Sequence, residues 1–212
     1  MKQPFTDFSG IAAALPIENI NTDAIIPSPW LRTAGGNLAK GLFGALRFDG
    51  NGNELDFILN REPFRKAQIL FAGRNFGCGS SREAAAWALR DFGIRAVFAP
   101  SFADIFHENA FRNGILAARI EEDCLAAVNA LIQRGTPSPA FAIDLDRETI
   151  TGPDGTVWAF AVAASRKRAL QTGADEIAMT LEHAAEIGRF HDVSRTNQPW
   201  LYRAVEAQGE VQ

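Results

Sequence analysis

The fold of this chain is decided by residues 68–99, which read QILFAGRNFGCGSSREAAAWALRDFGIRAVFA. Residues 68–72 are mostly apolar and are followed by a glycine, which indicates a short buried strand. Residues 82–92 are rich in alanine and other good helix formers, and Gly93 stands where a helix C-terminal cap is expected. Residues 95–99 are the next apolar run, which a proline ends. The stretch therefore predicts a strand, a glycine-rich turn, a helix and a second strand.

The same alternation continues toward the C-terminus. Residues 101–112 are expected to form a helix with Ser101 as its N-cap, residues 115–118 a third strand, and residues 121–133 a third helix. Repeated strand–helix units imply a parallel sheet with right-handed crossovers. Upstream, the apolar residues 11–15 predict one more short strand.

The regions outside this repeat are less regular. Residues 28–53 are rich in Gly, Ser, Pro and Asn, so we expect either a mobile binding loop or a poorly ordered segment, with Phe43, Leu46 and Phe48 tethering its far end to the core. The remaining predicted elements are short strands at 141–145, 148–150 and 157–161, helices at 164–171 and 175–189, and a polar C-terminal tail. Since no clear linker is visible, one domain over residues 1–212 is expected.

Composition narrows the range of functions. The chain has 212 residues, of which 47% are hydrophobic and 22% charged, so a core can form and wholesale disorder is excluded. Lys and Arg number 21 against 25 Asp and Glu, for a formal net charge of -4. Without a basic surplus to neutralise a phosphate backbone, nucleic acid is not expected as a partner.

The two cysteines, Cys78 and Cys124, are far apart and belong to no Cys/His cluster. This chain therefore lacks the thiolates for a zinc ribbon or for an iron–sulfur cluster of its own, and no metal site is expected. Sparse cysteines favour a reducing compartment. The N-terminal residues show no apolar signal region, and no run approaches the roughly 18 apolar residues of a membrane span. A cytoplasmic protein that does not associate with membranes is expected.

The turn after residues 68–72 carries the side chains best suited to chemistry. Gly77 and Gly79 allow positive φ angles and close approach of a ligand, and Ser80, Ser81 and Arg82 follow directly. Free amides at the helix N-terminus favour an anion, and a guanidinium fork fits a carboxylate. The pattern thus indicates a site for a small acidic ligand. A plain tight turn with a serine cap is the alternative.

Longer motifs make the turn more specific. The segments concerned are residues 75–83 with 87–89, residues 91–97 with 101–106, residues 21–23 with 25–27, residues 173–177, and residues 199–201. Together they resemble, in order along the chain, the swivel domain of the aconitase superfamily and, within it, the family of 3-isopropylmalate dehydratase small subunits. The resemblance implies an α/β fold, a three-layer β/β/α swivel domain.

The resemblance also implies roles for particular residues. Ser80 matches the catalytic serine, which acts as a base in its alkoxide form and needs stabilisation of that anion. The matching substrate-binding residues are Gly79, Ser81, Arg82, Asp23 and Arg32. Asp23 is expected to orient a charged partner across the site, or else to form an Asx turn. Arg32 is expected to read the variable arm of the substrate, or else to be a solvated surface residue.

In this family the 4Fe-4S cluster is on a large subunit, so we expect no cofactor on this chain and a heterodimer or higher assembly. The implied reaction interconverts 2-isopropylmalate and 3-isopropylmalate by dehydration and rehydration, in leucine biosynthesis. Ala84 and Ala86 stand where the family usually has His and Pro. Two alternatives remain open: a related hydro-lyase subunit acting on a dimethylmalate- or citramalate-like diacid, and a non-catalytic carboxylate-binding module.

Overall fold

The computed structural model describes residues 4–31, 37–135 and 139–202. The chain forms two compact units, Lys2–Gly173 and Ala174–Gln212, which are treated separately below. The single-domain organisation expected for residues 1–212 stays a prediction.

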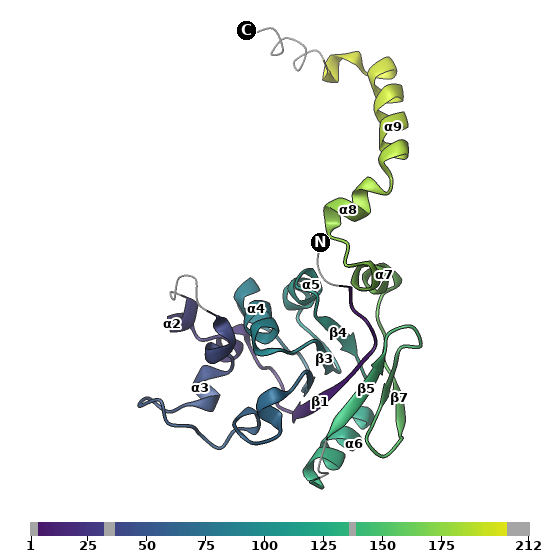
Figure 1. The fold of residues 1–212 in the computed structure, drawn as a ribbon. Coiled ribbons are helices and arrows are strands. Elements are labelled where there is room, and N and C mark those ends of the chain that lie inside the picture. Colours follow the sequence, from purple (N-terminus) through teal and green to yellow (C-terminus); the bar gives the residue numbers. More distant parts are fainter. Residues whose placement is uncertain (1–3, 32–36, 136–138, 203–212) are drawn as a thin grey trace. The chain divides into compact units, whose positions relative to one another are not determined.

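The first unit is built on a seven-stranded mixed sheet of order β4-β3-β2-β1-β5-β6-β7 (Figure 1). Its parallel part comprises β1 (Phe8–Leu15), β2 (Ile69–Ala72), β3 (Ala96–Ala99) and β4 (Leu116–Arg119). All residues of β2 and β3 are buried, as strands covered on both faces must be. The predicted strands and their parallel pairing are confirmed.

Three helices connect and follow these strands: α4 (Glu83–Phe92), α5 (Asp104–Arg112) and α6 (Glu122–Gln133). Gly93 takes φ +110° and closes α4, as the sequence predicted. The predicted N-cap of α5 was wrong, because Ala103 occupies that position. The Ser101 hydroxyl instead accepts a hydrogen bond from the Asn75 amide at 2.8 Å. Ser101 thus links the loops that follow β2 and β3.

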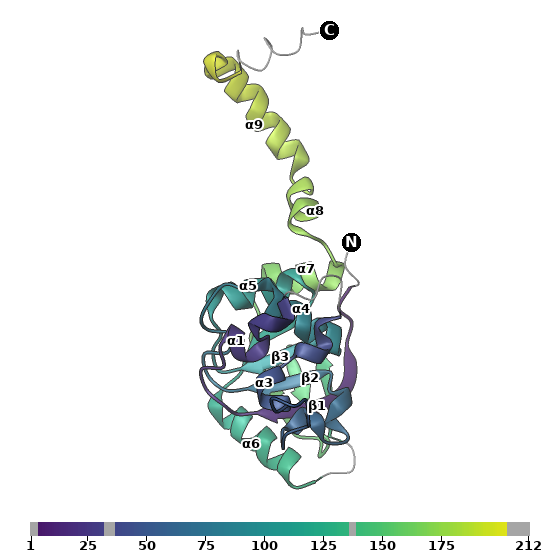
Figure 2. The same cartoon turned by 90° about the vertical axis from the view of Figure 1, so that its left-hand side faces the viewer.

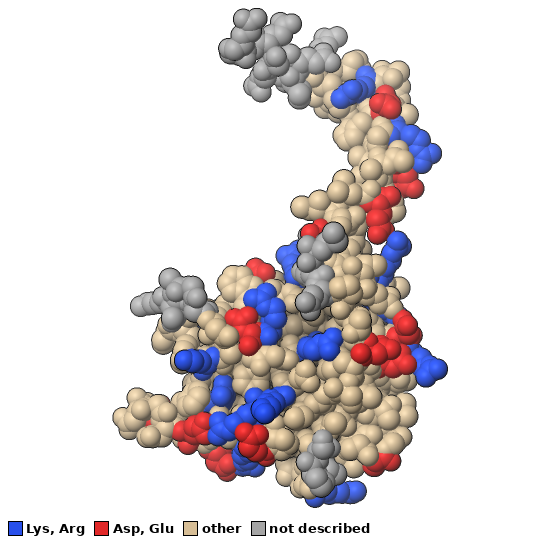
Figure 3. Space-filling view, viewed as in Figure 1, with Lys and Arg blue, Asp and Glu red and all other residues tan. Residues whose placement is uncertain are grey.

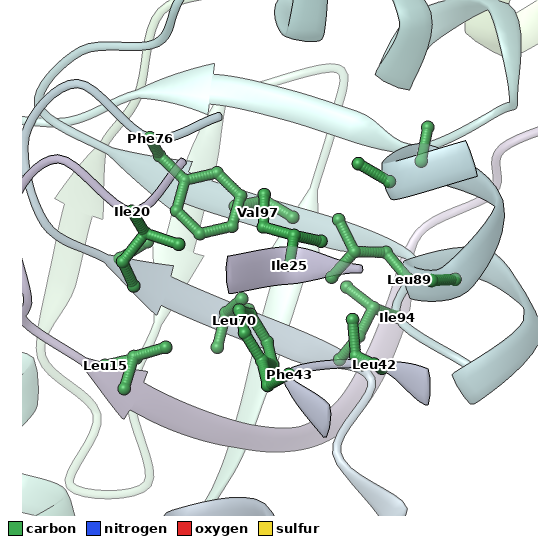
Figure 4. Close-up of a cluster of buried hydrophobic side chains, with 14 of the residues drawn as sticks. Leu15, Ile20, Ile25, Leu42, Phe43, Leu70, Phe76, Leu89, Ile94 and Val97 are labelled. Atoms are coloured by element: carbon green, nitrogen blue, oxygen red, sulfur yellow. The ribbon is translucent and has the colours of Figure 1, made fainter. Parts of the chain in front are cut away.

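Side chains alternate between the two faces of the parallel strands and so contribute to two cores. Leu70 and Val97 lie in a cluster with residues of α4 and α5, whereas Phe71 and Phe98 belong to a second cluster with residues of α6. Figure 4 shows the first cluster, in which Leu89 of α4 lies beside Ile25. Helices α4 and α5 therefore form a layer over one face of the parallel strands, and α6 packs on the other face.

The antiparallel strands cover the other face. They are β5 (Ala140–Asp144), β6 (Thr149–Thr151) and β7 (Val157–Ala159). Phe141 of β5 lies 5.3 Å from Phe71 between ring centroids, and Phe160 lies 5.3 Å from Phe98. The antiparallel strands thus pack on the parallel strands, on the face opposite α4 and α5 (Figure 1). Figure 2 looks onto the left-hand side of Figure 1, where α1 and α3 lie in front of the parallel strands. The expected three-layer α/β swivel fold is confirmed.

The segment between β1 and β2 consists of helical turns. They are α1 (Thr22–Ile25), α2 (Ser28–Leu31), η1 (Leu38–Gly41), α3 (Gly44–Arg47), η2 (Ile58–Asn60) and η3 (Phe64–Lys66). Within the segment 28–53, the described parts form short helices and a turn closed by the bridge between Phe48 and Glu54, while the expected mobility of this segment stays a prediction. Phe43 is fully buried, and the buried Arg47 donates to Asn60 Oδ1 at 3.0 Å. Leu46 and Phe48 are half-buried, so the expected tethers are in place.

The first unit ends with α7 (Ala164–Thr172). The second unit contains α8 (Glu176–Leu181), α9 (Ala184–Asn197) and η4 (Pro199–Leu201). One helix was predicted over 175–189, but the structure has two, and α9 continues to Asn197 where a polar tail was expected. Among the described residues, no helix is both long enough and apolar enough to cross a membrane.

Candidate functional site

The loop between β2 and α4 has a backbone that only glycine accommodates easily at two positions. Gly77 takes φ +79° and Gly79 takes φ +89°. A Cβ atom on Gly77 would also lie 2.2 Å from Cγ of Phe106, a buried residue of α5. The Gly-x-Gly spacing seen in the sequence is therefore a requirement of the loop's shape and packing.

This loop is joined to the upstream segment 20–23 by backbone hydrogen bonds. Gly77 N donates to Ile20 O at 2.7 Å, and Thr22 N donates to Cys78 O at 2.9 Å. Apolar contacts support the pairing, since Ile20 and Phe76 lie in the same buried cluster (Figure 4). The two motifs that carried the family resemblance are thus adjacent in space.

Ser80 and Ser81 are both exposed at the end of the loop, directly before α4. Within the described part of the chain, neither hydroxyl makes a hydrogen bond. The backbone at Ser80 is held nonetheless, because the Thr22 hydroxyl donates to Ser80 O at 2.8 Å. Both serine hydroxyls are therefore available to a ligand.

Arg82 is held by a residue from the upstream segment. Its Nη1 lies 2.5 Å from Asp23 Oδ1 and 3.5 Å from Ile26 O. The Arg82 side chain is 19% exposed and that of Asp23 is 53% exposed. Asp23 is thus paired with a charged side chain of the loop, and its expected role of orienting a charged partner across the site stays a prediction. The Asx turn is made by Asn21 instead, whose Oδ1 accepts from Ala24 N at 2.8 Å.

A pocket of about 240 Å³ lies over this loop. Its lining residues are Thr22, Gly77, Gly79, Ser80, Ser81, Arg82, Ala103, Asp104, Ile105 and Phe106. The pocket therefore brings together Gly79, Ser80, Ser81 and Arg82 with the first turn of α5. The N-termini of α4 and α5 both lie at this edge of the sheet, and their free amides favour a negative charge. A small carboxylate ligand matches this volume and these donors.

Sequence reasoning missed two parts of the site. Thr22 was noted only as a member of a motif, and its partner Ser80 is far along the chain. The wall formed by Ala103 and Phe106 was also missed, although Phe106 was expected in the core. The sequence pattern does indicate this wall. Two adjacent parallel strands end at the same edge of the sheet, so the loops that follow them lie side by side. Arg32 lies outside the described residues.

The side chains present do not fit a resident iron–sulfur cluster. Among the described residues, no three His, Cys, Asp or Glu side chains gather as a metal site would require. Burial raises the pKa of the Cys124 thiol to about 11, so that the thiolate is disfavoured there. Cys78 lies in the loop, where its thiol donates to Asn19 O at 3.4 Å.

Basic and acidic side chains are interspersed on the face of the molecule that Figure 3 shows. Among the described residues on that face, no continuous basic patch of the kind typical of nucleic-acid binding is seen.

Comparisons with known proteins identify the family to which this chain is similar. The Aconitase C-terminal domain family model matches residues 2–123. A "3-isopropylmalate dehydratase small subunit" of Parvibaculum lavamentivorans is 47% identical over 93% of this chain and 98% of its own length. The protein of that name from Jannaschia sp. (strain CCS1) is 48% identical over the same shares.

A solved structure is also similar. The crystal structure of 3-isopropylmalate dehydratase from Methanocaldococcus jannaschii superposes with a TM-score of 0.62 at 26% identity, covering 87% of this chain and 99% of that chain. The similarity thus extends over both motifs and the whole sheet. The chain belongs to the family of 3-isopropylmalate dehydratase small subunits, within the aconitase superfamily.

Proposed function

We propose that this chain is the small subunit of a two-subunit hydro-lyase that interconverts 2-isopropylmalate and 3-isopropylmalate. The observation that carries the proposal is a pair of serine hydroxyls that make no hydrogen bond within the described residues, beside a guanidinium held by Asp23 at two helix N-termini. The near full-length similarity to small subunits supports the same function. A place in leucine biosynthesis and in the cytoplasm belongs to this proposal.

Ser80 is proposed as the base. Dehydration removes a proton from the carbon next to the one that carries the hydroxyl, and rehydration returns a proton to one of the same two carbons. The Ser80 oxygen takes that proton in the first half of the reaction and gives it back in the second. A serine alkoxide needs strong stabilisation, which the amides at the start of α4 and the nearby Arg82 guanidinium would supply.

Arg82 and Ser81 are proposed to bind a substrate carboxylate. A guanidinium fork offers two parallel donors to a carboxylate, and the hydroxyl of Ser81 adds a third. Asp23 already holds Nη1 of Arg82, which restricts the plane of the fork before substrate arrives. Gly79 lets the backbone approach the ligand, and Arg32 is proposed to contact the variable arm of the substrate.

The dehydration also requires a Lewis acid that binds the leaving hydroxyl. We place it on a large subunit, whose 4Fe-4S cluster would act as a Lewis acid on that hydroxyl. The described side chains of this chain provide a base and carboxylate ligands but no set of cluster ligands. The proposed partner is therefore a cluster-bearing large subunit that closes the pocket lined by Ser80 and Arg82.

The test is reconstitution of the purified chain with the large subunit of the same organism. We expect the mixture to convert 2-isopropylmalate to 3-isopropylmalate, detected by mass spectrometry after chromatographic separation. Ser80→Ala is expected to lower kcat at least about 100-fold, because a positioned general base contributes on that order. Ser9→Ala is the matched control, since Ser9 Oγ donates to Phe141 O at 3.3 Å in the sheet.

Two outcomes would contradict the proposal. Turnover by the isolated chain without iron would remove the need for a partner. A flat profile of kcat/KM over isopropylmalate, a citramalate-like diacid and a dimethylmalate-like diacid would contradict a role specific to isopropylmalate. We expect kcat/KM to be highest for isopropylmalate.

A further inference from the structure

We propose that Thr22 is a positioning residue for Ser80, so that its hydroxyl sets where the catalytic oxygen points. The inference rests on the proposed function of Ser80. The Thr22 side chain bonds to the backbone carbonyl of Ser80 and not to its hydroxyl. Thr22 Oγ1 donates to the Ser80 carbonyl at 2.8 Å. The Thr22 side chain itself is assigned no chemistry on the substrate.

The backbone at Ser80 has few restraints other than the bond from Thr22. Within the described residues, the bond from Thr22 is the hydrogen bond that anchors residues 79–81. The preceding residue is a glycine at φ +89°, whose peptide can rotate more freely than that of any other residue type. Because the Ser80 hydroxyl has no hydrogen-bond partner in the part of the chain that the structure describes, its direction follows from the orientation of this backbone.

The donor, the Thr22 hydroxyl, is itself fixed in position. Thr22 is only 2% exposed, and its amide donates to Cys78 O at 2.9 Å. Its own carbonyl accepts from Ile26 N at 2.9 Å within the turn of α1. A β-branched side chain in such a buried position has little rotamer freedom. The hydroxyl is therefore held in place before substrate binds.

Asp23, the residue next to Thr22, restrains another part of the pocket. Asp23 follows Thr22 in α1 and holds Arg82 at 2.5 Å. One turn of helix thus restrains the base through Thr22 and the carboxylate ligand through Asp23. Both restraints come from a segment far from residues 79–82 in the sequence, so they fix the two sides of the pocket relative to each other.

The experiment compares Thr22→Val, Thr22→Ser and the control Ser9→Ala in the complex with the large subunit. Val keeps the shape of Thr without the hydroxyl, whereas Ser keeps the hydroxyl without the methyl group. A misplaced catalytic group costs on the order of 10- to 100-fold in rate, so we expect that loss of kcat in Thr22→Val. KM should change less than about twofold, since carboxylate binding by Arg82 is retained. Thr22→Ser and Ser9→Ala should keep kcat within about threefold of the unchanged chain.

A double variant tests whether Thr22 acts through the Ser80 hydroxyl. In a chain that already carries Ser80→Ala, we expect Thr22→Val to cause no further loss of kcat, because the hydroxyl being positioned is gone. Full additivity of the two losses would overturn the proposal, as would a kcat for Thr22→Val within twofold of the unchanged chain. If Thr22→Val does not fold, Thr22→Ser and Thr22→Ala replace the pair, since they differ only in the hydroxyl.

A measurement on the isolated chain separates this inference from the proposed reaction. The backbone amides of Gly77 and of residue 22, which bond to Ile20 O and Cys78 O between the two segments, are expected to exchange with deuterium faster in Thr22→Val than in Ser9→Ala, because the carbonyl anchor beside them is lost. Unchanged exchange would overturn the positioning role even if isopropylmalate turnover is observed. Absence of turnover in the unchanged complex together with faster exchange would overturn the reaction but keep the anchor.

Discussion

The guanidinium of Arg82 is held in the pocket by a carboxylate before any ligand binds. Asp23 is about half-exposed, so the ion pair contributes little to the stability of the fold. Its proposed value is geometric, because the contacts to Asp23 and Ile26 use Nη1 and leave Nε and Nη2 for a ligand. A lysine at this position would keep the charge but lose the planar pair of donors.

Arg82→Lys is therefore expected to lower kcat/KM about 10- to 100-fold, the range corresponding to a charge-assisted hydrogen bond. Steady-state kinetics of the reconstituted complex would measure this, with Arg61→Lys as the control. Arg61 also pairs with a carboxylate, Asp56 at 2.5 Å, but in an exposed segment outside the pocket. Equal effects of the two substitutions would refute a carboxylate-binding role for Arg82.

His107 is a second residue with a measurable consequence. Burial lowers the pKa of its imidazole, and the nearby Arg166 and Arg119 lower it further, whereas the hydrogen bond to Ala117 O and the charge of Glu108 act in the opposite direction. The ring stacks on Phe102 at 5.0 Å, and its Nδ1 lies 2.5 Å from Arg166 Nη1. The neutral ring is thus the form that fits the fold.

A depressed pKa in the folded state means that the unfolded chain binds more protons below the ordinary histidine value. The free energy of unfolding should therefore fall as pH drops from about 6.5 through the lower folded pKa, by at most about 1.4 kcal/mol per pH unit. Urea unfolding at pH 7.5 and pH 5.5, in the unchanged chain and in His107→Gln, would measure it. The same pH dependence in both chains would contradict the assignment to His107.

At the scale of elements, the β2–α4 loop depends on close packing against α5. Gly77→Ala would place a Cβ atom 2.2 Å from the Phe106 ring and impose φ +79° on alanine. We expect a loss of about 2–4 kcal/mol in the free energy of unfolding, from overpacking together with the left-handed backbone.

Gly93→Ala is the matched control for this loss. Gly93 has φ +110°, but an added Cβ atom would meet nothing within 4 Å. It should therefore show only the conformational part of the cost, about 1–2 kcal/mol. Denaturant titrations of the two variants would give both values, and an equal loss in both would argue against the contact with Phe106.

The strand–helix repeat could be predicted from the sequence because its determinants are local. Residues 69–99 alternate between a buried apolar run and an alanine-rich helix, and Gly93 ends the helix as expected. The serine and arginine of the candidate site follow from the same local pattern, since they fall at the end of a strand and the start of a helix.

The parts that could not be predicted depend on distant partners. The short helices between 38 and 60 are joined by Arg47, whose guanidinium donates to Ala39 O, Leu42 O and Asn60 Oδ1. Arg47 is buried and has no acidic partner in an ion pair within the described residues. A charged residue in a Gly- and Pro-rich segment is ordinarily read as exposed. Likewise, the bond between Thr22 and Ser80 spans 58 positions, so no local pattern indicates it.

For the molecule as a whole, we propose that the groups needed for the reaction are divided between two chains, with the base on this chain and the Lewis acid on its partner. The described residues place the proposed base Ser80, the guanidinium of Arg82 and two helix N-termini at one pocket, and they include no group of side chains suited to hold a metal cluster. The pocket lies at the edge of the sheet, where the aliphatic side chain of Ile105 in its lining is more than half-exposed. A partner that closes this pocket would complete the site.

The most direct test of this division is exchange of the substrate's C–H hydrogen with solvent deuterium. The complex is incubated with 3-isopropylmalate in D₂O, and the remaining substrate is analysed by mass spectrometry. We expect deuterium in the substrate with the unchanged small subunit and with Ser9→Ala, and none above background with Ser80→Ala. Deuterium incorporation by the Ser80→Ala complex at the unchanged rate would show that the base lies elsewhere and would contradict the account.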